Sequence, residues 1–66
     1  QIKFSNGWID VGELLVNPGP YDGQPCADPL EPDYGSGVGV AKFYANPNGK
    51  PTINSHAHGG QVFFLS

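Results

Sequence analysis

The stretch VGVAKFYANPNGKPTIN, residues 38–54, decides the fold that the sequence predicts. Residues 38–45 are rich in valine and aromatic side chains and contain no proline, which is typical of a strand. The Asn48-Gly49 pair readily takes the positive φ angles of a hairpin turn, and residues 51–54 then return as the partner strand. The sequence therefore predicts a β-hairpin in the second half of the chain.

A third strand is predicted at residues 61–65, QVFFL, directly after a pair of glycines. Because side chains alternate between the two faces of a strand, Val62 and Phe64 share one face and Phe63 and Leu65 the other. Both faces of this strand are apolar, so we expect each face to be covered, one of them by a neighbouring domain.

The first half of the chain has a weaker pattern. Residues 1–16 are predicted to form an N-terminal strand region, since the alternation over 8–16 suits a strand better than a helix. Residues 17–37 contain five of the seven prolines and four of the ten glycines, which predicts a long, acidic Pro/Gly-rich loop. The predicted fold is a single small mostly-β module over 1–66, with an antiparallel three-stranded sheet at 38–65.

Length and composition limit the possible functions. A 66-residue chain buries only about 60% of the surface that it exposes when unfolded, so it cannot hold a large independent enzyme core. The chain has no methionine and begins at Gln1, from which we expect a segment of a larger protein. The single cysteine, Cys26, favours a reducing compartment, and hence the cytoplasm. The longest apolar run, residues 62–65, is too short to cross a membrane.

The charge balance argues against strong autonomous binding of DNA or RNA. Three lysines and no arginine face six carboxylates, for a net charge of −3, whereas nucleic-acid-binding modules normally carry a basic stripe. Weak nucleic-acid contact within a larger protein remains open, through stacking of aromatic side chains such as Trp8 or Tyr44 on bases. Four of the carboxylates lie in the predicted loop: Asp22, Asp28, Glu31 and Asp33.

Two histidines one residue apart, within INSHAHGG at residues 53–60, raise the possibility of zinc. In an extended segment, residues two apart point to the same side, and a Cys-x-Asp segment repeats that spacing in the loop. Cysteine, histidine and aspartate all bind zinc, structural zinc has four ligands, and a metal would help so small a core. The candidate metal ligands are Cys26, Asp28, His56 and His58. Their spacings are not those of the usual zinc knuckles, and a polar corner between two strands is the alternative.

The same residues also allow two further interpretations. Cys26 as a nucleophile with His56 or His58 as its base would make a hydrolase, but the small size and the missing motifs disfavour a standalone enzyme. The glycine pair after His58 has a simpler explanation, because glycine reverses the backbone without a Cβ penalty. We therefore expect the motif of Ser55, His58, Gly59 and Gly60 to form the turn that returns the last strand to the hairpin.

Three stretches resemble a segment of the large primase/helicase replication proteins of prophages and other mobile elements. They are ADPLEPDYG (27–35), AKFYAN (41–46) and INSHAHGGQVFFL (53–65). That family usually has phenylalanine at the position of His56. The order of Cys-x-Asp, hairpin, His-x-His-Gly-Gly and apolar strand is also similar, as an analogy, to the zinc ribbon of bacterial primases. The positions that match the replication proteins are Asp28, Pro29, Tyr34, Gly35, Ala41, Lys42, Ser55, Ala57, His58 and Gly59.

The resemblance implies a non-catalytic accessory β module of a mobile-element DNA replication protein. Its partners would be the other domains of the parent protein, which would use ATP and magnesium to make primers or unwind DNA. None of those catalytic motifs occurs in these residues, so we expect the module itself not to be an enzyme. The alternative is a small protein-interaction domain that uses the acidic loop at 17–37 and the apolar last strand at 61–65.

Overall fold

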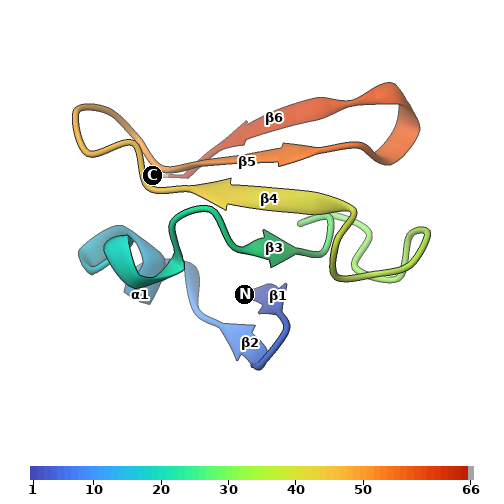
Figure 1. Cartoon of the computed structure of the whole chain (residues 1–66), viewed down its shortest axis with the longest axis horizontal. Coiled ribbons are helices and arrows are strands. Elements are labelled where there is room, and N and C mark those ends of the chain that lie inside the picture. The colour runs from blue at the N-terminus through green and yellow to red at the C-terminus, as the bar shows by residue number, and fades with distance from the viewer. Residues whose placement is uncertain (66) are drawn as a thin grey trace.

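The computed structural model describes residues 1–65 and shows a small, mostly-β antiparallel fold. Six strands form one sheet in the order β2-β1-β3-β4-β5-β6, which Figure 1 shows from bottom to top. The predicted class is confirmed, but the predicted count of three strands is wrong, because the first half of the chain adds three more. The strands are β1 (Ile2–Phe4), β2 (Gly7–Ile9), β3 (Pro25–Cys26), β4 (Ala41–Tyr44), β5 (Thr52–Ser55) and β6 (Gln61–Phe64).

The second half of the chain forms the predicted hairpin and third strand. Phe43 of β4 pairs with Ile53 of β5, and Ile53 pairs in turn with Phe63 of β6. Ala41, Phe43 and Ile53 are buried, so this row of side chains faces the core. The alternation of side chains along β4 accounts for the burial of Ala41 and Phe43 on one face.

The turn between β4 and β5 differs from the predicted one. The residue with a positive φ angle is Asn46, at 48°, and not the Asn48-Gly49 pair. The N–H of Gly49 donates to the carbonyl of Asn46 at 2.8 Å, which closes a β-turn with Pro47 at its second position. Proline favours that position because its ring fixes φ near the required value, so Pro47 outweighs the preference of the Asn-Gly pair.

A short helix replaces part of the strand that the sequence predicts over residues 8–16. That strand stops after Ile9, and α1 (Val11–Val16) follows it. The carbonyl of Asp10 accepts hydrogen bonds from the N–H groups of Glu13 (3.1 Å) and Leu14 (3.2 Å), which begins the helix. The prediction is wrong here because the apolar residues also have helical spacing, and Pro18 ends that helix. The helix residues that pack on the core are Val11, Leu14 and Leu15.

The segment predicted as a long loop, residues 17–37, contains more regular structure than expected. A 3₁₀ turn spans Gly19–Tyr21, and the two residues of β3 lie between β1 and β4 in the middle of the sheet. Cys26 pairs with Phe4 on one side and with Ala41 on the other. A strand of two residues has no detectable periodicity, so the sequence pattern does not reveal it.

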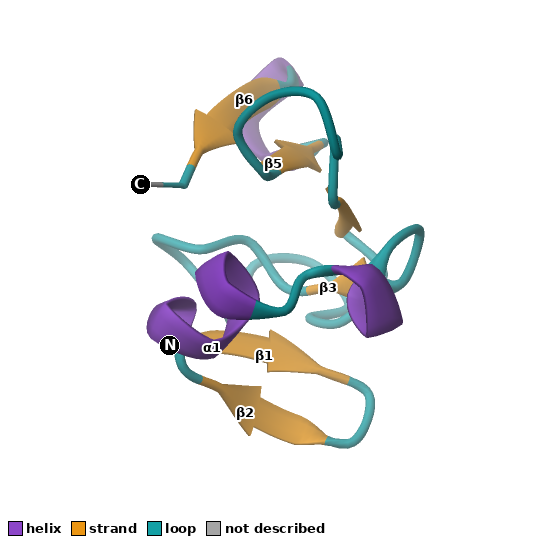
Figure 2. Cartoon of the chain, turned by 90° about the vertical axis from the view of Figure 1, so that its left-hand side faces the viewer, coloured by secondary structure: helices purple, strands orange, loops and turns teal. Residues whose placement is uncertain are grey.

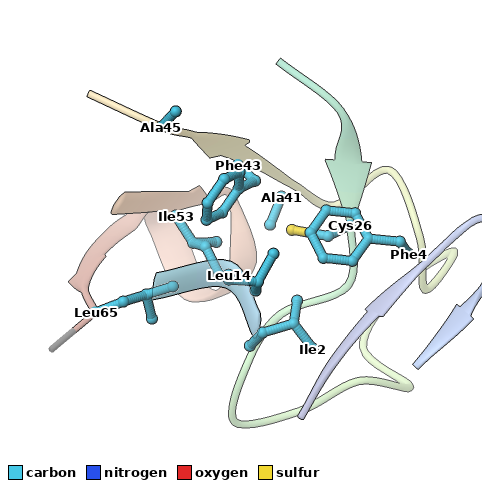
Figure 3. Packing of buried hydrophobic residues seen from close by; sticks show 9 residues of the cluster. All are labelled: Ile2, Phe4, Leu14, Cys26, Ala41, Phe43, Ala45, Ile53 and Leu65. Atoms are coloured by element: carbon cyan, nitrogen blue, oxygen red, sulfur yellow. The ribbon is translucent and has the colours of Figure 1, made fainter. Parts of the chain in front are cut away.

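The core lies on one face of the sheet and is closed by α1. Leu14 of the helix packs with Phe43 and Ile53 of the sheet, and none of these three side chains reaches solvent (Figure 3). Figure 2 shows the β1–β2 hairpin at one end of the sheet and β5–β6 at the other. No helix within residues 1–65 has the length and apolar character needed to cross a membrane.

The opposite face of the sheet has no covering element within residues 1–65. Lys42 and Tyr44 alternate with the buried residues of β4 and therefore lie on this outer face. On β6 the outer side chains are Val62 and Phe64, which are 54% and 69% exposed. The sequence predicts that both faces of the last strand need cover, and residues 1–65 cover only one of them.

Candidate functional site

A buried carboxylate joins the acidic loop to the hairpin. Asp28, only 3% exposed, accepts hydrogen bonds at Oδ1 from the N–H groups of Leu30 (2.9 Å) and Glu31 (2.8 Å). Its Oδ2 accepts a bond of 2.5 Å from the Ser55 hydroxyl, whose oxygen in turn accepts from the N–H of Ala57 at 3.2 Å. Every polar atom of this bridge has a partner, so the bridge is a structural tie.

The charge state of Asp28 follows from these contacts. Burial by itself raises the pKa of the carboxyl group, because the charged form loses water. The hydrogen bonds from Ser55, Glu31 and Leu30, together with the nearby His58, outweigh burial and hold the pKa of Asp28 below its ordinary value. Asp28 is therefore an anion at neutral pH, and its lone pairs are already used by fixed donors.

His58 closes the turn over the acidic loop. Its backbone is left-handed, with φ 51° and ψ 39°, and Gly59 and Gly60 follow with φ angles of 88° and 107°. The Nε2 atom of His58 contacts the Oε2 atom of Glu31. The imidazole also packs against the ring of Tyr34, with 4.6 Å between the ring centroids. His58 therefore holds two elements together at a largely solvated position.

His56 lies in different surroundings from His58. The backbone leaves the extended conformation at His56, where ψ is 2°, and a 3₁₀ turn spans Ala57–Gly59. His56 then lies at the groove on the outer face of the sheet, whereas His58 contacts Glu31 and Tyr34. The extended geometry that would let both imidazoles reach one ion is not present.

Cys26 is part of the core. The side chain is fully buried. Burial, helped by the negative charge of Asp28, raises the pKa of the Cys26 thiol to about 11. Because the thiolate is the nucleophilic form of cysteine, this environment disfavours a nucleophilic role. Within residues 1–65, no three His, Cys, Asp or Glu side chains are grouped so that they could hold a metal ion.

A groove of about 270 Å³ lies on the outer face, over β3, β4 and β5. The ladder between β4 and β5 places Lys42 opposite Asn54, and a hydrogen bond of 2.9 Å from the N–H of His56 to the carbonyl of Val40 continues that ladder. The groove is lined by the polar side chains of Lys42, Asn54 and His56 and by Tyr44 and Pro25.

The polar side chains of the groove have no side-chain hydrogen-bond or ion-pair partner within residues 1–65. Among residues 1–65, the side chains of Lys42, Asn54 and His56 form neither a hydrogen bond nor an ion pair. No carboxylate lines the groove, although the whole chain carries a charge of −3. The sequence analysis names His56 as a candidate metal ligand, Tyr44 as a stacking residue and Lys42 only as a position that carries the resemblance, and it does not name Asn54. The alternation of Lys42 and Asn54 with buried neighbours was the available signal.

Comparison with known proteins gives no match for this chain among protein-family models, curated proteins or solved structures. A function for this chain must therefore be inferred from the bridge between Asp28 and Ser55 and from the groove on the outer face. The bridge of Asp28 and Ser55 maintains the architecture. The groove with Lys42 and Asn54 presents unused polar groups to solvent.

Proposed function

We propose that this chain is a non-catalytic β module that works by binding, within a cytoplasmic DNA replication primase/helicase of a prophage or other mobile element. The observation that carries the proposal is the uncovered outer face of the sheet. Tyr44 pairs with Thr52, and Thr52 pairs with Phe64, so two aromatic side chains flank one row of this face. Large exposed apolar side chains that are grouped with polar ones mark a contact surface.

The non-catalytic role is supported by how the reactive side chains are used. Asp28 and Ser55 satisfy each other in a buried bridge, and the thiol of Cys26 has a raised pKa. His58 contacts Glu31 in the turn. Asp28 and Ser55 are therefore engaged with each other inside the fold, and the raised pKa of the Cys26 thiol disfavours the thiolate that a cysteine nucleophile needs.

The replication context is supported by the residues that carry the sequence resemblance. The matching positions come from stretches far apart in the chain, yet they meet in the fold. Asp28 bonds to Ser55, and Tyr34 packs against His58. The positions that carry the resemblance therefore belong to one structural unit of this chain.

The zinc-ribbon form of the proposal has less support. A structural zinc needs four ligands around one ion. Asp28 is occupied by Ser55, Cys26 lies in the core, and the two histidines have different surroundings. We therefore propose the module without a metal.

The second candidate is a small protein-interaction domain outside DNA replication. The observation that favours it is that Glu31 and Asp33 of the acidic loop are exposed. Such a domain would bind a basic partner, because charge complementarity guides association.

The experiment uses the whole natural protein that contains this chain. Primer synthesis on single-stranded DNA and ATP-dependent unwinding are measured for the wild type and for a Val62→Ser, Phe64→Ser double variant. We expect the wild type to show at least one of these activities and the variant to lose most of it while keeping its fold. Val16→Ser, at another exposed apolar position, is the matched control and should retain full activity. A wild-type protein with neither activity contradicts the replication role and favours the interaction domain.

A further inference from the structure

We propose that the groove between Lys42, Tyr44, Asn54 and His56 binds one nucleotide unit, with its phosphate at Lys42 and His56 and its base on Tyr44. The inference rests on the proposed function, because it names the ligand of the same sheet face. The ligand class is a planar base that carries a phosphate. A free mononucleotide and one unit of a single strand share this chemistry.

The size of the groove suits a small ligand. Its volume of about 270 Å³ lies just below the range of roughly 300–1,000 Å³ that is usual for ligand pockets. The groove is open on the surface of β4 and β5 and is not enclosed by the core. A single base with its phosphate fits this space, whereas a large cofactor does not.

The charge of the groove selects an anion. Lys42 is one of only three lysines, and the other two lie elsewhere: Lys3 beside the ring of Trp8, and Lys50 in the hairpin loop. No carboxylate lines the groove, and within residues 1–65 Lys42 has no ion-pair partner. In a chain with a charge of −3, the groove is therefore a local positive site. Lysine and histidine side chains both donate hydrogen bonds to phosphate oxygens.

The remaining two side chains suit a base. Tyr44 lies two residues after Lys42 on the same face of β4, and both residues line the groove. Aromatic side chains on a sheet face can stack on any of the bases of a nucleic acid, because every base has a π-face. Asn54, opposite Lys42, carries a donor and an acceptor, which is the pattern that pairs with the edge of adenine. An acidic peptide would use Lys42 but would leave Tyr44 and Asn54 without a role.

The test titrates the 66-residue chain, labelled with ¹⁵N, with four separate probes. They are adenosine monophosphate, an eight-nucleotide oligodeoxyadenylate, inorganic phosphate and a hexaglutamate peptide. We expect the first two to shift the amide signals of Lys42, Tyr44, Asn54 and His56 and to bind at least tenfold more tightly than phosphate or the peptide. Equal affinity per site for the first two identifies a free nucleotide as the ligand, and tighter binding of the oligonucleotide identifies a single strand.

Matched variants make the assignment specific. Lys42→Ala and Tyr44→Leu should each weaken binding of adenosine monophosphate at least tenfold, while Lys50→Ala should leave it unchanged. Leucine keeps an apolar side chain at position 44, and circular dichroism checks that each variant is folded. Lys42→Ala should also reduce the salt dependence of oligonucleotide binding, because one phosphate contact is lost.

Three outcomes overturn the inference. They are no binding of either nucleotide probe, tightest binding of the peptide, and phosphate bound as well as adenosine monophosphate. Each leaves the proposed function standing if the whole protein makes primers or unwinds DNA. Conversely, nucleotide binding by a chain whose whole protein lacks both activities supports the groove and contradicts the replication role.

Discussion

The hydroxyl of Ser55 and the carboxylate of Asp28 are joined by a buried hydrogen bond of 2.5 Å across 27 residues of chain. The bond fixes the acidic loop to β5, and the loop brings Glu31 and Tyr34 to the histidine turn. The turn before β6 is therefore held by contacts between distant parts of the sequence, of which the bond between Ser55 and Asp28 is the buried one.

Ser55→Ala should destabilise the protein, because it leaves a buried carboxylate without one of its donors. The expected loss of unfolding free energy is about 1–3 kcal/mol. Urea unfolding followed by circular dichroism measures it. Ser36→Ala, an exposed serine of the same loop, is the matched control and should change the midpoint little. An unchanged midpoint for Ser55→Ala would show that the bridge contributes nothing.

Stability should fall at acidic pH through Asp28. Its pKa in the folded protein is lower than in the unfolded chain, so its contribution is fully present above the unfolded pKa of about 3.9. The contribution is lost as the pH falls through the lower, folded pKa. Unfolding midpoints between pH 7 and pH 3 for the wild type and for Asp28→Asn measure this effect. The gap between the two proteins should be large at pH 7 and should shrink toward pH 3; a constant gap would contradict it.

Leu14→Ala should remove much of the stability of this small domain. Leu14 is fully buried against the sheet, and truncation of such a leucine costs about 2–5 kcal/mol. A helix as short as α1 does not persist by itself, so it depends on this packing. Val16→Ala, two residues later at a position that is 87% exposed, should change the midpoint by less than about 0.5 kcal/mol. Similar losses for both variants would contradict this packing of the helix.

Cys26 should resist alkylation in the folded protein. Its thiol has a pKa of about 11, so at pH 8 its thiolate fraction is on the order of a hundredfold lower than for an ordinary cysteine. Iodoacetamide labelling at pH 8, followed by mass spectrometry with and without urea, measures the difference. Equal rates in the two conditions would mean that the thiol is exposed in the native state.

The parts of the fold that the sequence predicts are those with local signals. The strands around Phe43 and Phe63 are rich in valine and aromatic residues and contain no proline, and both appear in the structure. The helix at Val11–Val16 is under two turns long and contains a glycine, so its pattern also fits a strand. Two-residue β3 has no pattern, and its place in the sheet depends on pairing with distant residues.

The candidate site shows the same limit. The importance of His58 is visible from the turn residues that follow it, but its contact with Glu31 is not, since 27 residues separate them. The outer position of Lys42 follows from alternation on β4. That Lys42 lies opposite Asn54 depends on the register between β4 and β5. The turn that connects these strands has its positive φ angle at Asn46 and not at the Asn48-Gly49 pair that the sequence predicts.

The brevity of β3 has a consequence for how the chain folds. Pro25 and Cys26 are the sole strand residues that connect the β1–β2 ribbon to the β4–β5–β6 ribbon within the described sheet. Contacts within β4–β6 are local, and we expect them to form first, whereas β1 and β3 must close longer loops before they pair. We expect native-state hydrogen exchange to show β1 and β2 opening as one cooperative unit, with a smaller opening free energy than β4 and β5. The more stable part of the module would then be β4 and β5, which line the groove, and β1 and β2 would unfold first.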